Sequence, residues 1–177
     1  MSESIVDLRS DTVTRPTAEM RAVMAAAEVG DDQLEGDPTT RRLEARTAEL
    51  LGKEAALFFP SGIMANQTAL AVLGGPGDEI IVEAGAHILH YEGAAASAIA
   101  GLQLNPVFTP DGRLTADLAR PAVRPRSRYL PRTVAVAVEN THLASGGSVM
   151  AEEDGLGIRE LADQAGLFVH MDGARLW

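Results

Sequence analysis

The chain has 177 residues, 46% of them hydrophobic, so a single globular domain can bury on the order of 70% of its unfolded surface. Its 25 acidic and 15 basic side chains give a formal net charge of −10, which repels the phosphates of nucleic acids and anionic membranes. The absence of cysteine excludes disulfide scaffolds and thiolate metal sites. We expect no nucleic acid, membrane or metal partner. Because the first residues do not resemble a secretory signal, we expect a cytoplasmic protein.

Two helices joined by an acidic loop are predicted at the N-terminus. Between Thr17 and Ala27, apolar side chains recur at intervals of three and four residues, as on one face of an amphipathic helix. Asp37 and Pro38 have the residue types of an N-cap and a first helical position, and Gly52 is a typical helix stop. The pattern therefore predicts a second helix that ends at Gly52.

Short apolar runs alternate with helical patterns through the rest of the chain. The strand candidates are 55–59, 79–83, 103–107, 133–138 and 167–171, and the helix candidates between them are 63–73, 90–100, 114–120 and 154–165. Several runs are apolar on both faces, as in strands of a parallel sheet that helices cover on both sides. We therefore predict an α/β fold, with a mostly parallel sheet and helices on both faces.

The chain is expected to divide into two parts. Residues 1–52 are predicted to form an N-terminal segment of helix and loop, and residues 53–177 a larger unit built on the sheet. The arginine-rich stretch from Arg120 to Arg132 reads as a surface connection, because runs of like charge usually face solvent.

Chemically useful side chains follow the predicted strands. In an open parallel sheet, ligands bind beyond the carboxyl ends of the strands, so these positions are expected to share one edge. They include a turn that leads into a helix, whose free amides suit a phosphate, together with an imidazole, a carboxylate and a guanidinium. The residues are Ser61, Gly62, Ile63, His87, Asp172 and Arg175.

Each of these residues also has an ordinary structural interpretation. Ser61 is a common helix N-cap, and His87 is equally explained as a loop histidine bonded to the backbone. Asp172 is harder to explain in this way, because a carboxylate after an apolar strand needs a partner or solvent. Lys53, the single lysine of the chain, is most simply a cation at the end of a helix.

Together the residues match the needs of a pyridoxal phosphate (PLP) site. Such a site holds the phosphate at a helix N-terminus, stacks a side chain on the ring and pairs a carboxylate with the pyridine nitrogen. The carboxylate keeps that nitrogen protonated, so the ring can accept electrons from a carbanion at the substrate's α-carbon.

The sequence resembles the threonine aldolases of the β-eliminating lyase group, PLP enzymes of the aspartate-aminotransferase-like fold. The resemblance runs in order along the whole chain and rests on several motifs. They are Asp7 to Thr14, Val29 to Asp32, Gly36 to Thr39, Ser61-Gly62 with Asn66-Gln67, His87 with Tyr91-Glu92, Glu139 to His142 and His170 to Arg175.

The resemblance implies a role for each matching residue. Asp172 would pair with the pyridine nitrogen, His87 would stack on the ring, and Ser61 to Ile63 would bind the phosphate. Ser10 and Arg175 would lie near the substrate carboxylate. The implied reaction cleaves L-threonine or L-allo-threonine to glycine and acetaldehyde, with His87 near the β-hydroxyl, in an enzyme that is a homo-oligomer.

Three departures from the family pattern bear on activity. The family's Schiff-base lysine lies beyond the Asp172 motif, whereas this chain stops at Trp177, so we expect a fragment that lacks this lysine and the small C-terminal domain. Ile63 stands where relatives often carry threonine. Tyr129 stands where many relatives carry a histidine near the substrate hydroxyl, so Tyr129 is a candidate substrate-binding residue.

Two alternatives remain open at this stage. Another PLP lyase or a racemase acting on β-substituted amino acids would use the same scaffold. Alternatively, the chain is a non-catalytic module that needs a partner chain.

Overall fold

The computed structural model describes residues 6–177, which divide into two compact units. The first unit ends at Phe58 and the second is Phe59–Trp177. This boundary lies within the stretch between the predicted second helix and the turn at Ser61. Each unit is described separately below.

The first unit holds the two predicted helices. They are α1 (Ala18–Ala25) and α2 (Pro38–Leu51), preceded by a short 3-10 helix, η1 (Asp11–Val13). Asp37 caps α2, because one carboxylate oxygen accepts a bond from Thr40 N at 2.7 Å. Gly52 ends the helix with a φ of 59°, a left-handed conformation that glycine adopts without steric cost.

The strand predicted at 55–59 is not formed. These residues are an extended connection, and Leu57 and Phe58 remain 70% and 53% exposed. The Phe58 amide donates to a side chain, Glu44 Oε1, at 2.8 Å rather than to a neighbouring strand. An apolar run becomes a strand only where another strand accepts its ladder of hydrogen bonds, and no described strand does so here.

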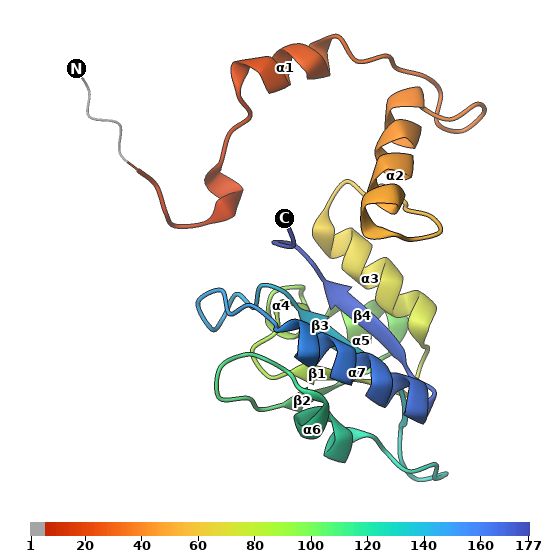
Figure 1. Ribbon diagram of the computed structural model, residues 1–177. Coiled ribbons are helices and arrows are strands. Elements are labelled where there is room, and N and C mark those ends of the chain that lie inside the picture. The colour runs from red at the N-terminus through yellow and green to blue at the C-terminus, as the bar shows by residue number, and fades with distance from the viewer. Residues whose placement is uncertain (1–5) are drawn as a thin grey trace. The chain divides into compact units, whose positions relative to one another are not determined.

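The second unit is built on a parallel sheet of four strands in the order β2-β1-β3-β4 (Figure 1). The strands are β1 (Asp78–Glu83), β2 (Gln103–Val107), β3 (Arg132–Glu139) and β4 (Phe168–Asp172). The other four predicted strands are thus present, and the predicted α/β fold is confirmed.

Helices cover both faces of this sheet. The longer ones are α3 (Gly62–Leu73) and α7 (Glu152–Ala165), and the shorter ones are α4 (His87–His90), α5 (Ala95–Ala100), α6 (Ala116–Ala119) and η2 (Arg120–Ala122). α3 and α5 share one core cluster with the sheet, whereas α6 and α7 share the other. None of the helices in residues 6–177 has the length and hydrophobicity that a membrane span requires.

Alternation along the strands explains the two cores. Ile80 and Val82 of β1 belong to the cluster beneath α3, while Ile81 between them belongs to the cluster beneath α7. Successive side chains of a strand point to opposite faces, so a strand covered on both sides must be apolar throughout. Each fully buried isoleucine contributes about 1.5–3 kcal/mol to this core.

The helix predicted at 90–100 is interrupted. α4 ends at His90 and α5 begins at Ala95, because Gly93 and Ala94 take left-handed φ angles of 63° and 55°. This break turns Glu92 inward, where it is 5% exposed. The interruption therefore supplies a residue of the site described next.

Candidate active site

Three strands of the second unit end in carboxylates at one edge of the sheet. Glu83, Glu139 and Asp172 are the last residues of β1, β3 and β4, and all three are buried. Glu139 Oε2 accepts a 2.7 Å hydrogen bond from the backbone amide of His87. The end of β3 thereby fixes the position of the first residue of α4.

Asp172 is buried at the end of β4 and accepts hydrogen bonds on both of its carboxylate oxygens. Its Oδ2 accepts a bond from Asn66 Nδ2 at 2.9 Å, and its Oδ1 accepts one from the Ala174 amide at 3.2 Å. A carboxylate oxygen can accept more than one hydrogen bond, so a further donor can be accommodated. Its chemistry suits a cationic N–H group.

The Asn66 amide is oriented by His170. Asn66 Nδ2 donates to both Asp172 Oδ2 and Glu92 Oε1, each at 2.9 Å, while its Oδ1 lies 3.1 Å from His170 Nε2. Desolvation by burial lowers the pKa of His170 below its ordinary value of 6.5, an effect that the charges of Asp172 and Glu92 oppose. A neutral His170 therefore carries its proton on Nε2 and donates to Asn66.

Glu92 connects this amide to His87. Its Oε1 lies 2.9 Å from His87 Nδ1, and its Oε2 accepts a 2.5 Å bond from Gln67 Nε2. One ligand-type atom each of His87, Glu92 and Asp172 lies within 4.8 Å of the others. The imidazole and the terminal carboxylate of β4 thus belong to one hydrogen-bonded group.

The N-terminus of α3 lies on the same helix as Asn66. Ser61 Oγ caps the helix by accepting a bond from Met64 N at 3.2 Å. Ser61, Gly62 and Ile63 are exposed, and the space beside the Gly62 α-carbon is open. At about 1.5 Å per residue, Asn66 lies only about 6 Å along the helix from Gly62. A ligand of modest size can therefore reach both Asp172 and the free amides of α3.

Arg175 and Ser10 are two further residues of the predicted site. Arg175 occupies the turn after β4, which is closed by a 3.0 Å bond from Leu176 N to Gly173 O. Ser10 belongs to the first unit, where its Oγ caps η1 by accepting a bond from Thr12 N at 3.2 Å. The roles of Ser10 and Arg175 near a substrate carboxylate remain predictions.

Tyr129 lies at the opposite edge of the sheet. It precedes β3, at the amino end of a strand whose carboxyl end lies beside Asp172. Tyr129 is 78% exposed, and the Arg128 guanidinium lies 4.6 Å from the centroid of its ring. The chain does not bring Tyr129 together with His87 or Asp172, so its contact with substrate also remains a prediction.

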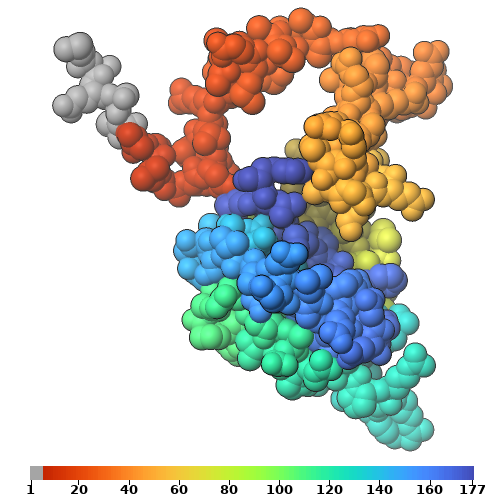
Figure 2. Space-filling model, viewed as in Figure 1, coloured from red at the N-terminus to blue at the C-terminus, as the bar shows by residue number. Residues whose placement is uncertain are grey.

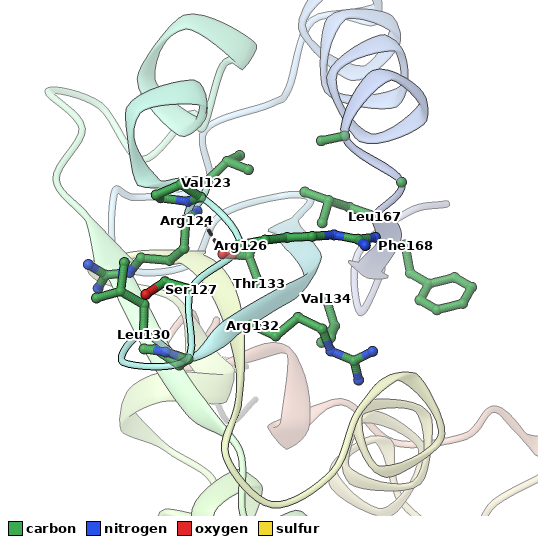
Figure 3. A pocket seen from close by; sticks show the side chains of 14 residues that line it. Val123, Arg124, Arg126, Ser127, Leu130, Arg132, Thr133, Val134, Leu167 and Phe168 are labelled. Carbon is green, nitrogen blue, oxygen red and sulfur yellow. Dashed lines mark hydrogen bonds between the residues drawn. The ribbon is translucent and has the colours of Figure 1, made fainter.

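The arginine-rich stretch is an exposed connection that projects from the second unit (Figure 2). A cavity of about 450 Å³ lies beside it, lined by residues of this connection and by the start of β4 (Figure 3). Arg124 and Arg132 are engaged there by Glu79 and Asp78, at 3.1 and 2.8 Å. The cavity thus lies at the amino edge of the sheet, away from Asp172.

The residues at the carboxyl edge fit pyridoxal phosphate in part. Asp172 suits the pyridine nitrogen, His87 presents an imidazole that is 30% exposed, and the N-terminus of α3 suits a phosphate. The donor set lacks an amine, because Lys53 is the single lysine of the sequence and lies in the first unit. The second unit can therefore hold the ring and the phosphate but supplies no amine for the aldehyde.

Sequence reasoning assigned no role to Asn66, Glu92 or His170. Asn66 and Glu92 lie in motifs that carried the resemblance, and His170 opens another. The sequence did contain a signal, because the amide pair Asn66-Gln67 lies in the mostly apolar helix α3. A buried amide pair needs partners, which predicts acidic or carbonyl neighbours.

Comparison with known proteins is consistent with this arrangement. Residues 7–177 match the family described as beta-eliminating lyase. The chain belongs to this family. It is 44% identical over 176 residues to low-specificity L-threonine aldolase 1 of Arabidopsis thaliana, a match that covers 97% of this chain and 49% of the relative. A threonine aldolase structure from Leishmania major superposes with a TM-score of 0.74 at 25% identity, covering 89% of this chain and 45% of that one.

Not every relative in the family is named as an aldolase. Alanine racemase TOXG of Cochliobolus carbonum is 34% identical over 174 residues, covering 97% of this chain and 44% of the relative. The chain spans about half the length of the curated relatives that it matches. Family membership is therefore clear, whereas the reaction of the whole protein is a separate question.

Proposed function

We propose that the protein containing this chain is a PLP-dependent aldolase that cleaves L-threonine and L-allo-threonine to glycine and acetaldehyde. The observation that carries the proposal is the buried Asp172 carboxylate, held by Asn66 one helical turn from the exposed N-terminus of α3. Asn66, which holds the site for a cationic ring nitrogen, lies about 6 Å along α3 from the site for a phosphate at Gly62. The family relationship supports the same conclusion.

The proposed roles follow from the geometry. Asp172 binds the ring N–H, and Ser61 to Ile63 bind the phosphate through the backbone amides of α3. When bound, PLP withdraws electrons from the substrate's α-carbon and so weakens its bonds. His87 accepts the β-hydroxyl proton as the bond between the α- and β-carbons breaks.

A chimera provides a direct test of this function. It joins the present chain, at Trp177, to the C-terminal half of the Arabidopsis aldolase, which supplies the lysine expected from the family resemblance. With PLP, we expect acetaldehyde from threonine or allo-threonine, measured by coupled alcohol dehydrogenase. The matched control is the same chimera carrying Asp172→Ala. A folded, PLP-loaded chimera that releases no acetaldehyde from either isomer contradicts the proposal.

Another PLP reaction on the same scaffold is the second candidate. The relative named as an alanine racemase favours considering it. A racemase would convert L-alanine to its mirror image, and a β-eliminating enzyme would release pyruvate and ammonia from serine. Analysis of the products of the same chimera separates these reactions from aldol cleavage.

The alternative hypothesis is that the isolated chain is a non-catalytic module that needs a partner chain. The position of its single lysine, outside the second unit, motivates this alternative. Borohydride reduction after addition of PLP tests this hypothesis. Labelling at Lys53 together with turnover would exclude the module, whereas the absence of both labelling and turnover would support it. Homo-oligomerisation and a cytoplasmic location also remain predictions, of which the first is checked by sedimentation.

A further inference from the structure

We propose that Glu92 is a positioning residue for His87: it holds the proton on His87 Nδ1, so that Nε2 is the nitrogen that accepts a proton at the site. This inference deepens the proposed function. It depends on that function only for the identity of the proton that Nε2 accepts.

The contacts of Glu92 make it an acceptor on both oxygens. Its side chain is fully buried, and Asn66 Nδ2 and Gln67 Nε2 both donate to it. Asn66 cannot be turned to present its oxygen instead, because that oxygen would then face the carboxylate oxygens of both Glu92 and Asp172. An acceptor at 2.9 Å from His87 Nδ1 requires that nitrogen to be the donor.

The backbone holds His87 against Glu92 from the other side. Glu139 at the end of β3 binds the His87 amide, and Glu92 lies only five positions after His87, in the break between α4 and α5. Within residues 6–177, the side-chain hydrogen bond of His87 uses Nδ1 and leaves Nε2 available to a ligand. With Nδ1 protonated, this second nitrogen of neutral His87 carries the lone pair.

Such an arrangement favours proton acceptance. When Nε2 takes a proton, the ring becomes a cation, and the buried Glu92 carboxylate beside Nδ1 stabilises it. The Asn66 amide donates to Glu92 and Asp172 together, so the proton acceptor and the proposed partner of the ring nitrogen are held in one network. A change at Glu92 is therefore expected to act on His87 without direct contact with substrate.

The tautomer of His87 provides a test that needs neither cofactor nor turnover. Long-range ¹H–¹⁵N spectra of the uniformly ¹⁵N-labelled chain report which ring nitrogen carries the proton, and H87N identifies the His87 signals. In the unsubstituted chain we expect neutral His87 to be protonated on Nδ1. Protonation on Nε2 would overturn the proposal even if no variant folds.

Three variants separate positioning from a merely structural role. E92M removes the acceptor at similar volume, and we expect its His87 proton to move to Nε2. E92Q keeps an acceptor oxygen, because Gln67 can turn its unpartnered Oε1 toward the new amide, so it retains the Nδ1 proton. Q67M removes a neighbour of Glu92 that does not contact His87, and it too retains the Nδ1 proton.

The outcomes discriminate between the two proposals. A folded E92M whose His87 stays protonated on Nδ1 overturns the role of Glu92, and so does a Q67M variant whose His87 tautomer switches. If the chimera described above lacks aldolase activity while these tautomers behave as expected, the proposed function fails and the inference about Glu92 stands.

Discussion

Asn66 and Asp172 lie 106 residues apart in the sequence and are joined by a hydrogen bond of 2.9 Å from Nδ2 to Oδ2. This bond ties the first turns of α3 to the end of β4. Because both N–H groups of the Asn66 amide are bound by carboxylates, the amide has one orientation, and its oxygen faces His170. The relationship places a buried negative charge beside a helix N-terminus, which is the basis of the proposed PLP site.

Asp172→Asn is expected to weaken PLP binding by about 10- to 100-fold. The substitution keeps the shape of the side chain and an acceptor oxygen for Asn66, but it removes the charge that pairs with the ring nitrogen. Hydrogen bonds to charged groups contribute roughly 1.5–3 kcal/mol, which gives this range. Titration of the chain with PLP, followed by the absorbance of the cofactor, measures the change.

Asp163→Asn is the matched control for this experiment. Asp163 is an exposed residue of α7 in a surface pair with Arg159, so its loss should leave PLP affinity unchanged. Equal affinities for all three proteins would mean that Asp172 does not bind the ring.

Ser61→Asp is expected to separate helix capping from phosphate binding. Aspartate caps a helix as well as serine and interacts favourably with its N-terminus, so stability should change by less than about 0.5 kcal/mol. Its negative charge would nevertheless repel a phosphate docked at the α3 amides. We expect a loss of PLP affinity with an unchanged urea midpoint.

Pyridoxal without phosphate provides the control for Ser61→Asp. If the variant binds PLP less tightly but binds pyridoxal as well as the unsubstituted chain does, the effect is on the phosphate. Undiminished PLP affinity would place the phosphate elsewhere.

The sheet was predictable from sequence because its signals are local. Runs such as Ile80 to Val82 are apolar on both faces, and that pattern alone requires cover on both sides. The run at 55–59 is also apolar throughout but forms no strand, because strand formation depends on a partner that an apolar run does not specify. The local sequence pattern therefore predicted which segments can form strands. Pairing with a neighbouring strand determined which of these segments are strands in the folded chain.

The site was predictable only at the ends of elements. His87 and Asp172 follow or end strands, where topology concentrates ligands. Asn66 lies inside a helix, and Glu92 lies in a predicted helix that is in fact broken at Gly93 and Ala94. Their roles depend on contacts over 26 and 106 residues, which no periodicity encodes.

His170 is expected to make the stability of the second unit depend on pH. Burial lowers its folded-state pKa below the unfolded value of 6.5. As the pH falls below about 6.5, the unfolded state therefore binds more protons than the folded state, and stability decreases by up to about 1.4 kcal/mol per pH unit. The contribution is fully present above about pH 6.5 and is lost progressively below it.

Urea unfolding at about pH 7.5 and about pH 5.5 measures this dependence. His170→Gln keeps a donor for Asn66 but does not titrate, so its stability should change less between the two conditions. Carboxyls with lowered pKa values, such as Asp78 and Asp111, titrate below 3.8 and do not contribute in this window. An identical decrease in both proteins would assign the dependence to other groups.

Gly112→Ala and Gly146→Ala are expected to differ in stability although the two glycines share a backbone conformation. Their φ angles are +82° and +83°, so each substitution forces alanine into the left-handed region, which lowers the free energy of unfolding by about 1 kcal/mol in both variants. A methyl group at position 146 meets open space, whereas one at 112 would overlap Ser145 Oγ and His142 Nδ1.

That overlap disturbs a pair that supports the edge of the sheet. His142 Nε2 lies 2.9 Å from Glu83 Oε2 at the end of β1, and its Nδ1 lies 3.0 Å from Ser145 Oγ. Overpacking costs about 1–3 kcal/mol, so the free energy of unfolding of Gly112→Ala should be lower than that of Gly146→Ala by this amount, and its urea midpoint should be lower too.

The same two variants have a second readout at the site. Because His142 follows the end of β3 that holds the His87 amide, only Gly112→Ala should also shift the His87 ring signals in ¹H–¹⁵N spectra. Equal urea midpoints for Gly112→Ala and Gly146→Ala would show that the loop after β2 accommodates the methyl group without strain and does not stabilise this edge of the sheet.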